Sequence, residues 1–445
     1  MPEAEVGAPR RLIGRFDATM LVVGSMIGSG IFIVSAESSR LVGTGARLLL
    51  VWGTAGLLTC LAALCCAELA VMFPKAGGPY VFFREAYGDL AGFLFGWTLV
   101  LVIQTGTIAA VAVAFARFLG VLVPSVEGWT ARLVAAGVVL VLTFTNSLGL
   151  KTGTRTQNVL TVVKYVALFS LMAGGFLAPR VAGGPASLPS TPEGGALALA
   201  FAAALVGPAF AQSAWTNVTF AGAEVARPER TFPFALAGGC LLVTVLYVAT
   251  NVSYLRVLGL DGIAHAPLDR VGTAAAARLL PGSGASLMAG FILISTFGCA
   301  NGLILSGARV IYALAKDGLF FGAAARLNDR AVPGAALVVQ ALWSSLLALS
   351  GTYSQLLQYV VSVELVVVIL LVAAVPVLRR KQPGVARPYR TFGYPATPTV
   401  FFLLAIPLTV LLAVARPHTT WPGYLLVLAG LPAYAIARRA TRSDG

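Results

Sequence analysis

The segment GSMIGSGIF, from Gly24 to Phe32, interrupts an apolar run that extends over residues 17–41. Three glycines and two serines fall within its first seven residues. Each glycine weakens a helix by roughly 1 kcal/mol relative to alanine. The composition therefore predicts that the helix breaks here. The alternative explanation is close packing of an unbroken helix through its small residues.

A second interruption, GPAFAQSAWTN at residues 207–217, lies inside the apolar run 194–224. In lipid, broken backbone persists only where it is buried in protein or lines a wet cavity. Interrupted segments in matching positions of two halves are typical of a transporter's binding site. We therefore expect the two segments to face each other around a ligand.

The composition of the whole chain places it in a membrane. Of its 445 residues 58% are hydrophobic and only 11% are charged, and the mean hydropathy is +0.87. A soluble domain carries about 25% charged residues. So few charges cannot cover a water-soluble globule of this size, which excludes one large soluble domain.

Apolar runs of about 20 residues, the length that crosses a bilayer as a helix, recur along the chain. The first run is too long for a signal peptide and lacks a clear cleavage site, so we expect it to be retained. We predict twelve spans, at residues 17–41, 47–73, 88–123, 131–149, 158–178, 194–224, 232–255, 284–316, 333–350, 354–378, 397–416 and 420–437.

The basic residues predict the orientation. With the N-terminus inside, 21 Lys and Arg residues fall on the cytoplasmic side and 9 on the outside, while Lys164 lies within a span. This asymmetry predicts that both termini are cytoplasmic. The Ala-, Gly- and Arg-rich composition suggests a bacterial chain, hence a bacterial plasma (inner) membrane. Because the positive charge is spread over seven inner segments, it excludes a nucleic-acid-binding patch.

The two interrupted spans lie five spans apart, and five is an odd number. The first five spans (17–178) and the next five (194–378) would therefore be inverted repeats. Residues 397–437 would form two further helices, with cytoplasmic tails at 1–16 and 438–445.

The helix ends at the breaks predict the ligand. A half-helix that begins near Ser29 and Gly30 offers free N–H groups and a positive dipole end, which suit a carboxylate. A half-helix that ends near Phe210 offers free carbonyls, which suit an ammonium group. Together they fit an α-amino acid, and we expect glycine at 28 and 30 to let it approach the backbone.

The chain resembles the amino acid–polyamine–organocation (APC) transporter superfamily, and within it the L-type amino acid transporter family and its bacterial relatives, over most of its length. The resemblance implies an all-α polytopic membrane protein. Its 5+5 inverted-repeat (LeuT-like) fold would have 12 transmembrane helices, with helices 1 and 6 discontinuous and two extra C-terminal helices. The matching segments are Gly28–Phe32, Ala67–Leu69, Pro74–Tyr80, Phe210-Ala211, Trp215, Glu224, Arg227–Pro233, Ser295–Gly298 and Asn301-Gly302.

The resemblance also implies roles for residues at the breaks. Phe210 would be an aromatic gate above the substrate, with ordinary packing as the alternative. The substrate carboxylate would bind the backbone around Gly28, Ser29 and Gly30. The amino group would bind carbonyls around Met26, Phe210, Ala211 and Ser213.

Lys164 is the only basic residue that we place mid-span, and a lysine there costs at least about 2.5 kcal/mol unless it is paired or snorkels. The resemblance places it where sodium-coupled relatives hold a sodium ion. There its ammonium group would tie span 1 to span 8 and repel sodium, which predicts sodium-independent transport. Cys299 stands where relatives often have serine, which would weaken a hydroxyl partner for Lys164.

Glu364 lies deep in the tenth span, and an intramembrane carboxylate is a functional candidate by default. It would be either proton-linked or simply paired or water-facing. We group it with Lys164, Cys299 and Trp215 as candidates for gating and coupling. Glu68 and Glu224 are expected near cytoplasmic helix ends, where they would brace the inner gate.

The leading hypothesis is a secondary amino acid transporter, not an enzyme, that moves neutral L-amino acids by alternating access through exchange or proton-coupled uptake. Neutral substrates are favoured because neither break contains an acidic side chain. A cationic amino acid or polyamine permease of the same fold is the alternative. The expected partners are the amino acid and the lipid bilayer, while a homodimer and a partner subunit stay open.

The sequence lacks the chemical groups that other classes of function would need. An intramembrane enzyme would need a metal cluster or a nucleophile–base pair. Both histidines, His265 and His418, lie in predicted external loops, and the cysteines of the second span have no histidine partner. A primary pump would need a phosphate loop, and the chain contains no Gly-Lys dipeptide. Inverted broken spans favour a carrier over a channel, and we expect no cofactor and no metal.

Overall fold

The computed structural model describes residues 12–75, 77–148, 154–180, 187–189, 191–316, 318, 322–328 and 332–443. For residues 154–163, 313 and 437–443 it describes the backbone alone. The predicted N-terminal tail lies outside the described residues as far as residue 11. In the predicted C-terminal tail (438–445), the structure describes only the backbone of residues 438–443, and residues 444–445 lie outside the described residues.

The described part of the chain is helical, with two isolated β-bridges that join Ile13 to Val225 and Thr44 to Ser187. Its first half contains α1 (Arg15–Met26), η1 (Gly30–Phe32), α2 (Ser35–Val42), α3 (Gly45–Met72), α4 (Pro79–Tyr87), α5 (Asp89–Thr98), η2 (Leu99–Gln104), α6 (Thr105–Leu122), α7 (Gly128–Ser147) and α8 (Thr154–Leu177).

The second half begins with α9 (Gly194–Ala211), α10 (Asn217–Phe220), η3 (Gly222–Glu224), α11 (Pro228–Pro233), η4 (Phe234–Gly238), α12 (Gly239–Ala264), η5 (Pro267–Asp269) and α13 (Val271–Leu279). It continues with α14 (Gly284–Lys316), η6 (Gly322–Ala325), α15 (Gly334–Ser350), α16 (Tyr353–Lys381), α17 (Ala396–Ala415) and α18 (Pro417–Ser443).

Helices occupy each of the twelve predicted spans, with the first span divided between α1 and α2. Among the described residues, eight helical segments are long and apolar enough to cross a membrane, and two shorter apolar helices are Lys164–Leu177 and Gly334–Ser350. The chain is therefore a polytopic helical membrane protein, while the number of twelve crossings stays a prediction.

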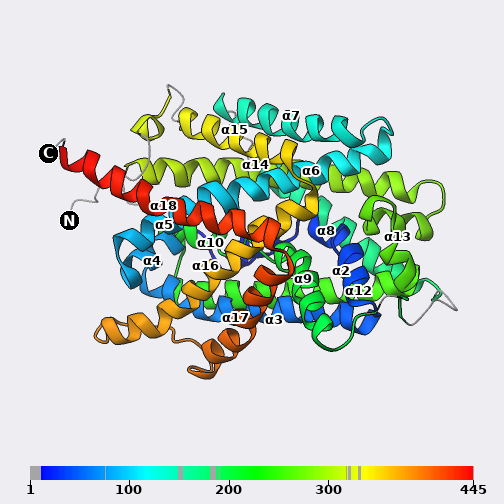
Figure 1. Cartoon of the computed structure of the whole chain (residues 1–445), viewed down its shortest axis with the longest axis horizontal. Coiled ribbons are helices and arrows are strands. Elements are labelled where there is room, and N and C mark those ends of the chain that lie inside the picture. Colours follow the sequence, from blue (N-terminus) through cyan, green and yellow to red (C-terminus); the bar gives the residue numbers. More distant parts are fainter. Residues whose placement is uncertain are drawn as a thin grey trace.

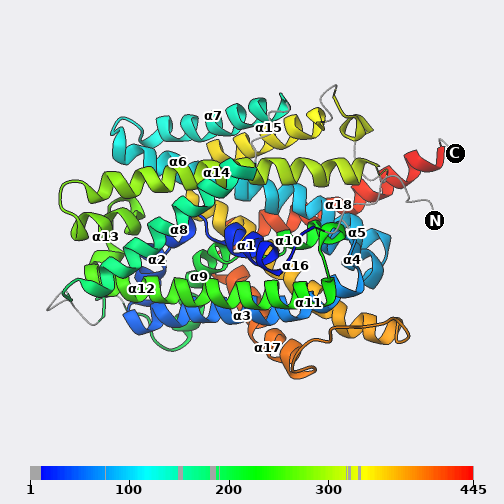
Figure 2. The ribbon, with the colours of Figure 1, turned by 180° about the vertical axis from the view of Figure 1, so that it is seen from behind.

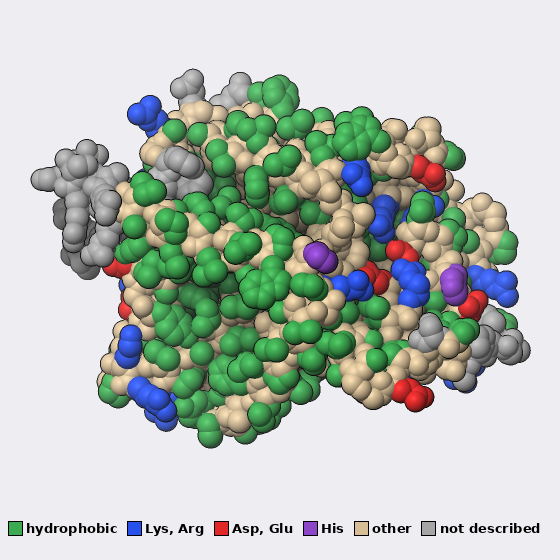
Figure 3. Space-filling view, viewed as in Figure 1, with side chains coloured by type: hydrophobic (Ala, Val, Ile, Leu, Met, Phe, Trp, Pro, Cys, Tyr) green, Lys and Arg blue, Asp and Glu red, His purple; other side chains and the backbone are tan. Residues whose placement is uncertain are grey.

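The long helices lie side by side along the longest axis of the molecule (Figures 1 and 2). Helices α7 and α15 form one flank beside α14, and α17 lies on the opposite flank next to α3. Figure 3 shows hydrophobic side chains over the middle of one face, with most charged side chains toward its left and right. Such a band is what a helical bundle presents to lipid.

Both predicted interruptions are confirmed as breaks in the helices. Helix α1 ends at Met26, and Ile27 adopts an extended conformation with φ −75° and ψ 95° before η1 begins. Helix α9 continues past Pro208 to Ala211, and Ala214 then takes a left-handed φ of 67°. The α9 helix therefore ends one residue later than the position near Phe210 that we predicted.

Each half of the first broken span pairs with one half of the other. Ser38 on α2 donates a hydrogen bond of 2.8 Å to the carbonyl of Ala204 on α9. At the opposite ends, Ile13 N donates to Glu224 O at 3.0 Å, and Ala226 N donates to Ile13 O at 2.9 Å. These contacts hold the two breaks at the same depth in the bundle.

Candidate functional site

The two breaks touch at Gly30 and Ala211. A Cβ atom added to Gly30 would lie 2.7 Å from Ala211 Cβ and 3.0 Å from its Cα, closer than side chains pack. The missing side chain of Gly30 therefore makes room for Ala211, while approach of a ligand to its backbone stays a prediction. A Cβ atom on Gly28 would meet no atom within 4 Å, so open space faces the backbone there.

Backbone donors are available at the start of η1. Within the described residues, the N–H groups of Ser29, Gly30 and Ile31 make no hydrogen bond, whereas Phe32 N already donates to Ser29 O at 3.1 Å. The first turn of a helix presents such N–H groups together with the positive end of the dipole. Free backbone donors therefore lie at residues 29–31, and binding of a carboxylate around Gly28, Ser29 and Gly30 stays a prediction.

Two buried hydroxyls accompany these donors. The side chains of Ser29 and Tyr353 are neighbours, and neither hydroxyl makes a hydrogen bond of normal geometry. Both residues are only 2% exposed. An unsatisfied hydroxyl costs free energy in a dry interior, so the pair is suited to a polar ligand. Sequence reasoning missed Tyr353, whose only signal was a tyrosine at the start of the tenth span.

Phe210 covers this region from α9. Its ring is buried, and it meets the ring of Tyr353 edge to face, with centroids 6.4 Å apart and planes at 81°. The guanidinium of Arg117 lies 5.3 Å from the centre of the Tyr353 ring. Phe210 therefore packs on Tyr353, the neighbour of Ser29, and its role as an aromatic gate stays a prediction.

The carbonyl ends of both breaks share one partner, Tyr247 on α12. Its hydroxyl lies 2.9 Å from Met26 O and 3.2 Å from Ala211 O, while Phe210 O accepts from Ser213 Oγ at 2.8 Å. A hydroxyl has one proton, so the two carbonyls share it and each keeps a free lone pair. Sequence reasoning missed Tyr247, because a tyrosine in an apolar run gives no signal of its partners.

Lys164 reaches the first break from α8. Its ammonium nitrogen donates to Gly24 O at 2.8 Å and to Ile27 O at 3.2 Å, and the residue is only 3% exposed. These contacts exclude the snorkelling alternative. Cys299 on α14 lies close enough to interact electrostatically with the ammonium group. Both recorded hydrogen bonds, however, join α8 to α1, so the expected tie to span 8 rests on Cys299 alone.

A cavity beside Tyr353, here named the Tyr353 cavity, opens between α2, α6, α9 and α16 and contains about 390 Å³ of space that no atom fills. Charged side chains surround it. Asp269 pairs with Arg40 at 2.8 Å and with Arg117 at 3.8 Å, and Ser354 donates to Glu37 at 2.6 Å. The cavity reaches Tyr353, on which Phe210 packs.

A second cavity, here named the Glu364 cavity, lies between α3, the segment after α9, α16 and α17, and contains about 450 Å³ of such space. Its wall includes Ser213, Trp215 and Glu364. Glu364 and Trp215 thus lie together but apart from Lys164 and Cys299. Among the described residues Glu364 makes no ion pair.

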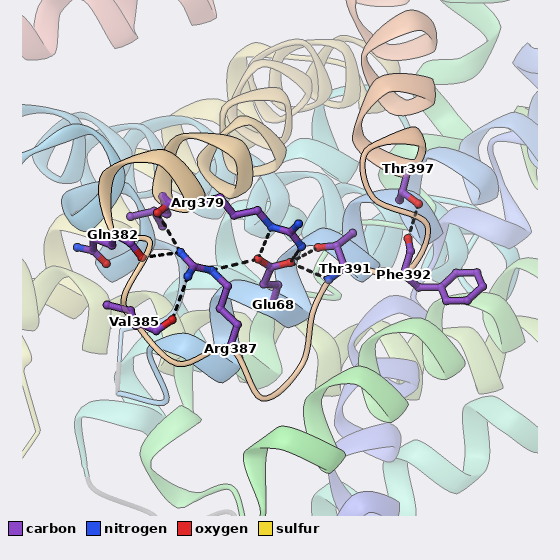
Figure 4. A network of polar contacts seen from close by, with 9 residues as sticks. Glu68, Arg379, Gln382, Val385, Arg387, Thr391, Phe392 and Thr397 are labelled. Atoms are coloured by element: carbon purple, nitrogen blue, oxygen red, sulfur yellow. Dashed lines mark hydrogen bonds and ion pairs between the residues drawn. The ribbon is translucent and has the colours of Figure 1, made fainter.

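Glu68 lies near the C-terminal end of α3 and belongs to a separate network of hydrogen bonds and ion pairs (Figure 4). Its carboxylate is fully buried and accepts from Arg379 Nε at 2.9 Å, from a second Arg379 nitrogen at 2.7 Å, and from Thr391 N and Oγ1 at 2.7 Å. Arg387 adds an ion pair at 3.6 Å. This arrangement fits a brace between α3, α16 and the α16–α17 connection, not a substrate site.

The apolar bundle and its paired helix breaks define a polytopic membrane carrier. The model of the amino acid permease family matches residues 13–432, and the chain belongs to that family. It is therefore a transporter of the APC superfamily and not an enzyme.

Several characterised transporters are similar to this chain along most of its length. The serine/threonine exchanger SteT of Bacillus subtilis (strain 168) is 28% identical over 437 residues, covering 96% of each chain. The large neutral amino acids transporter small subunit 2 of Oryctolagus cuniculus is 30% identical over 451 residues, covering 97% of this chain and 82% of that protein. The Asc-type amino acid transporter 1 of Mus musculus is 29% identical over 440 residues, covering 96% and 81%.

Proposed function

We propose that this transporter carries neutral L-amino acids by alternating access, with the substrate held between the two helix breaks. The proposal rests on two observations. The N–H groups of Ser29, Gly30 and Ile31 are free, and the hydroxyls of Ser29 and Tyr353 beside them are unsatisfied. They would bind the carboxylate. The amino group would bind the lone pairs left on the carbonyls of Met26, Phe210, Ala211 and Ser213.

The proposal includes the finer architecture of the membrane domain. The chain would cross the membrane twelve times, with residues 17–178 and 194–378 as inverted repeats and residues 397–437 as two added helices. Both termini would lie in the cytoplasm of a bacterial cell, with the protein in the plasma membrane. The helix breaks at corresponding positions of the two halves and the distribution of basic residues support this arrangement.

Sodium plays no part in the proposed cycle. The ammonium group of Lys164 already occupies the carbonyls of Gly24 and Ile27 at the first break. The ammonium group donates to carbonyls that a sodium ion would otherwise coordinate. Its fixed positive charge also repels a second cation. Lys164 and Cys299 would thereby couple α8 and α14 to movement of α1.

Exchange of one amino acid for another is the transport mode that the relatives favour, since one of them is named a serine/threonine exchanger. Their printed names also favour neutral substrates. Phe210 and Trp215 would close over the substrate and reopen on the other side of the membrane as the two broken helices move.

Uptake by proteoliposomes tests this function. The purified chain is reconstituted and offered labelled serine, threonine, alanine, leucine and phenylalanine, with and without external sodium and with and without a pH gradient. We expect at least one neutral amino acid to enter without sodium. Strict dependence on sodium would contradict the role of Lys164, and no uptake of any neutral amino acid would contradict the substrate class.

A further inference from the structure

The connection between α16 and α17, residues 382–395, carries basic and aromatic side chains on its exposed face. Arg390 is exposed, as are Arg380 and Lys381 at the end of α16. The side chain of Phe392 is 76% exposed. Figure 1 shows this connection at the lower left, at one end of the bundle, and Figure 3 shows Lys and Arg side chains next to hydrophobic ones in the same place. The face therefore combines positive charge with apolar surface.

The connection lies between the ends of two candidate membrane spans. Helix α16 is one such span and ends at Lys381, and α17 is the next and begins at Ala396. A segment that joins two successive spans lies at a membrane surface, because each span ends where the hydrocarbon ends. With the orientation proposed above, this surface is the cytoplasmic leaflet, which carries anionic lipids. The connection therefore meets lipid headgroups.

Contacts with Glu68 fix the connection on its inner side. Thr391 donates to the Glu68 carboxylate through N and Oγ1 at 2.7 Å, and Arg387 forms an ion pair with it at 3.6 Å. Arg387 also donates to Leu378 O at 2.9 Å. Figure 4 shows the ring of Phe392 pointing away from this network. Because the backbone is held in place, the ring stays on the outer side, where only an external partner can bury it.

Two basic side chains of this region have no partner. In the described part of the chain, the guanidinium groups of Arg380 and Arg390 make neither an ion pair nor a hydrogen bond. Their sequence neighbours Arg379 and Thr391 both bond the Glu68 carboxylate. The two unpaired arginines thus flank a single fixed point, although they are ten positions apart in the sequence.

Acidic residues do not balance the charge of this region. Residues 379–390 contain five basic residues, and residues 365–443 contain no Asp or Glu. The described carboxylates that approach from other elements are those of Glu68 and Glu85. Glu68 already holds two arginines, and Glu85 accepts from Gln382 at 3.4 Å. The outer face therefore keeps a net positive charge that suits an anionic partner.

The headgroup of an anionic phospholipid complements this face in both charge and polarity. A guanidinium group donates two parallel hydrogen bonds to a phosphate group. An aromatic ring at the membrane–water interface packs at the level of the headgroups. A soluble phosphate would match the arginines but would leave the Phe392 ring in water. A lipid satisfies the charges and the ring together.

We propose that Arg380 and Arg390, together with the exposed ring of Phe392, bind the headgroup of an anionic phospholipid. The lipid would neutralise the two unpaired charges and cover the ring on the outer side of the α16–α17 connection. This inference does not depend on which amino acid is transported. Its failure and the failure of the proposed function are therefore separate results.

Binding of labelled lipid to the full chain tests this inference. Purified protein in detergent is mixed with radiolabelled dioleoylphosphatidylglycerol or dioleoylphosphatidylcholine and captured on an affinity resin, and the retained lipid is counted per protein. We expect wild type to prefer phosphatidylglycerol. Arg380→Gln/Arg390→Gln should lower the ratio of phosphatidylglycerol to phosphatidylcholine at least about fivefold, since two charges near the headgroup are lost. Arg380→Lys/Arg390→Lys keeps both charges and should retain most of the ratio.

Arg180→Gln/Arg278→Gln is the matched control, because it removes two charges from exposed arginines outside the connection, one after α8 and one on α13. It should leave the ratio unchanged. Variants are compared at equal amounts of folded protein, judged by gel filtration in detergent. If the double variant folds poorly, Arg390→Gln alone is measured and should lower the ratio at least about twofold.

Three results would overturn the inference. Wild type would retain the two lipids equally, or Arg380→Gln/Arg390→Gln would keep the ratio within about twofold of wild type. In the third, soluble glycerol phosphate at the concentration of the lipid would displace phosphatidylglycerol, which would assign the two arginines to a free phosphate.

Discussion

The ammonium nitrogen of Lys164 donates to the backbone carbonyl of Gly24 at 2.8 Å, which joins α8 to the last turn of α1. A second bond to Ile27 O at 3.2 Å lies directly beyond the end of that helix. The charge is thus satisfied by carbonyls that the break itself exposes. The position of the first break and the position of Lys164 therefore depend on each other.

Replacing Lys164 by methionine should reduce amino acid uptake at least about tenfold, because hydrogen bonds to a charged group are lost at two carbonyls. The measurement is the initial rate in proteoliposomes at equal protein content. Lys316→Met is the control, since Lys316 is exposed at the end of α14. Uptake by the Lys164 variant within about twofold of wild type would show that this link is dispensable.

Replacing Tyr247 by phenylalanine should lower stability by about 1 kcal/mol, because Met26 O and Ala211 O lose their shared donor. Uptake should also fall, since this hydroxyl holds the carbonyl ends of both breaks together. Thermal unfolding in detergent and transport rates measure the two effects. Tyr424→Phe, which removes a 3.4 Å bond to Ser362 O, is the comparison and should change transport little. Equal transport by both variants would contradict the bridging role.

Alanine at Gly28 and at Gly30 should have opposite effects. Gly30→Ala should reduce the yield of folded protein, because the new methyl group overlaps Ala211. Gly28→Ala should fold normally and weaken substrate binding, because its methyl group enters the space reserved for the ligand. Gel filtration and the Michaelis constant for uptake separate the two outcomes. Normal folding of the Gly30 variant would mean that the two breaks do not touch as described.

Replacing Glu68 by glutamine should destabilise the protein by about 3 kcal/mol, since breaking one side of a buried ion pair leaves the other uncompensated. The affected partners are Arg379 and Arg387 (Figure 4). The Michaelis constant of the remaining folded protein should not change, because the network lies away from the breaks. A large change in substrate affinity without loss of stability would assign Glu68 to the substrate site.

Local signals explain which parts of the fold and site could be predicted. Glycine, proline and serine act on their own backbone, so both helices break inside the segments 24–32 and 207–217 that the sequence indicates. A charge inside an apolar run is equally local, which is why Lys164 and Glu364 stood out. The end of α9 at Ala211 lies one residue beyond the predicted position near Phe210, because the helix continues through Pro208.

Contacts between distant segments could not be predicted from the same signals. Tyr247 meets Met26 across 221 positions of sequence, and nothing in its own segment indicates that partner. The roles of Gly28 and Gly30 also depend on a distant residue, because only Ala211 distinguishes a packing glycine from one that faces a ligand. The cavity that joins Ser213 to Glu364 has the same origin in tertiary packing.

Counterflow in sodium-free proteoliposomes tests the central claim most directly. Vesicles are loaded with an excess of the unlabelled neutral amino acid that the uptake panel identifies, and entry of the same labelled amino acid is followed against empty vesicles. A carrier with one site between two moving breaks predicts that internal substrate accelerates entry and that Lys164→Met and Ser29→Ala slow it. Entry at the same rate into loaded and empty vesicles, or entry only after sodium is added, would contradict the account.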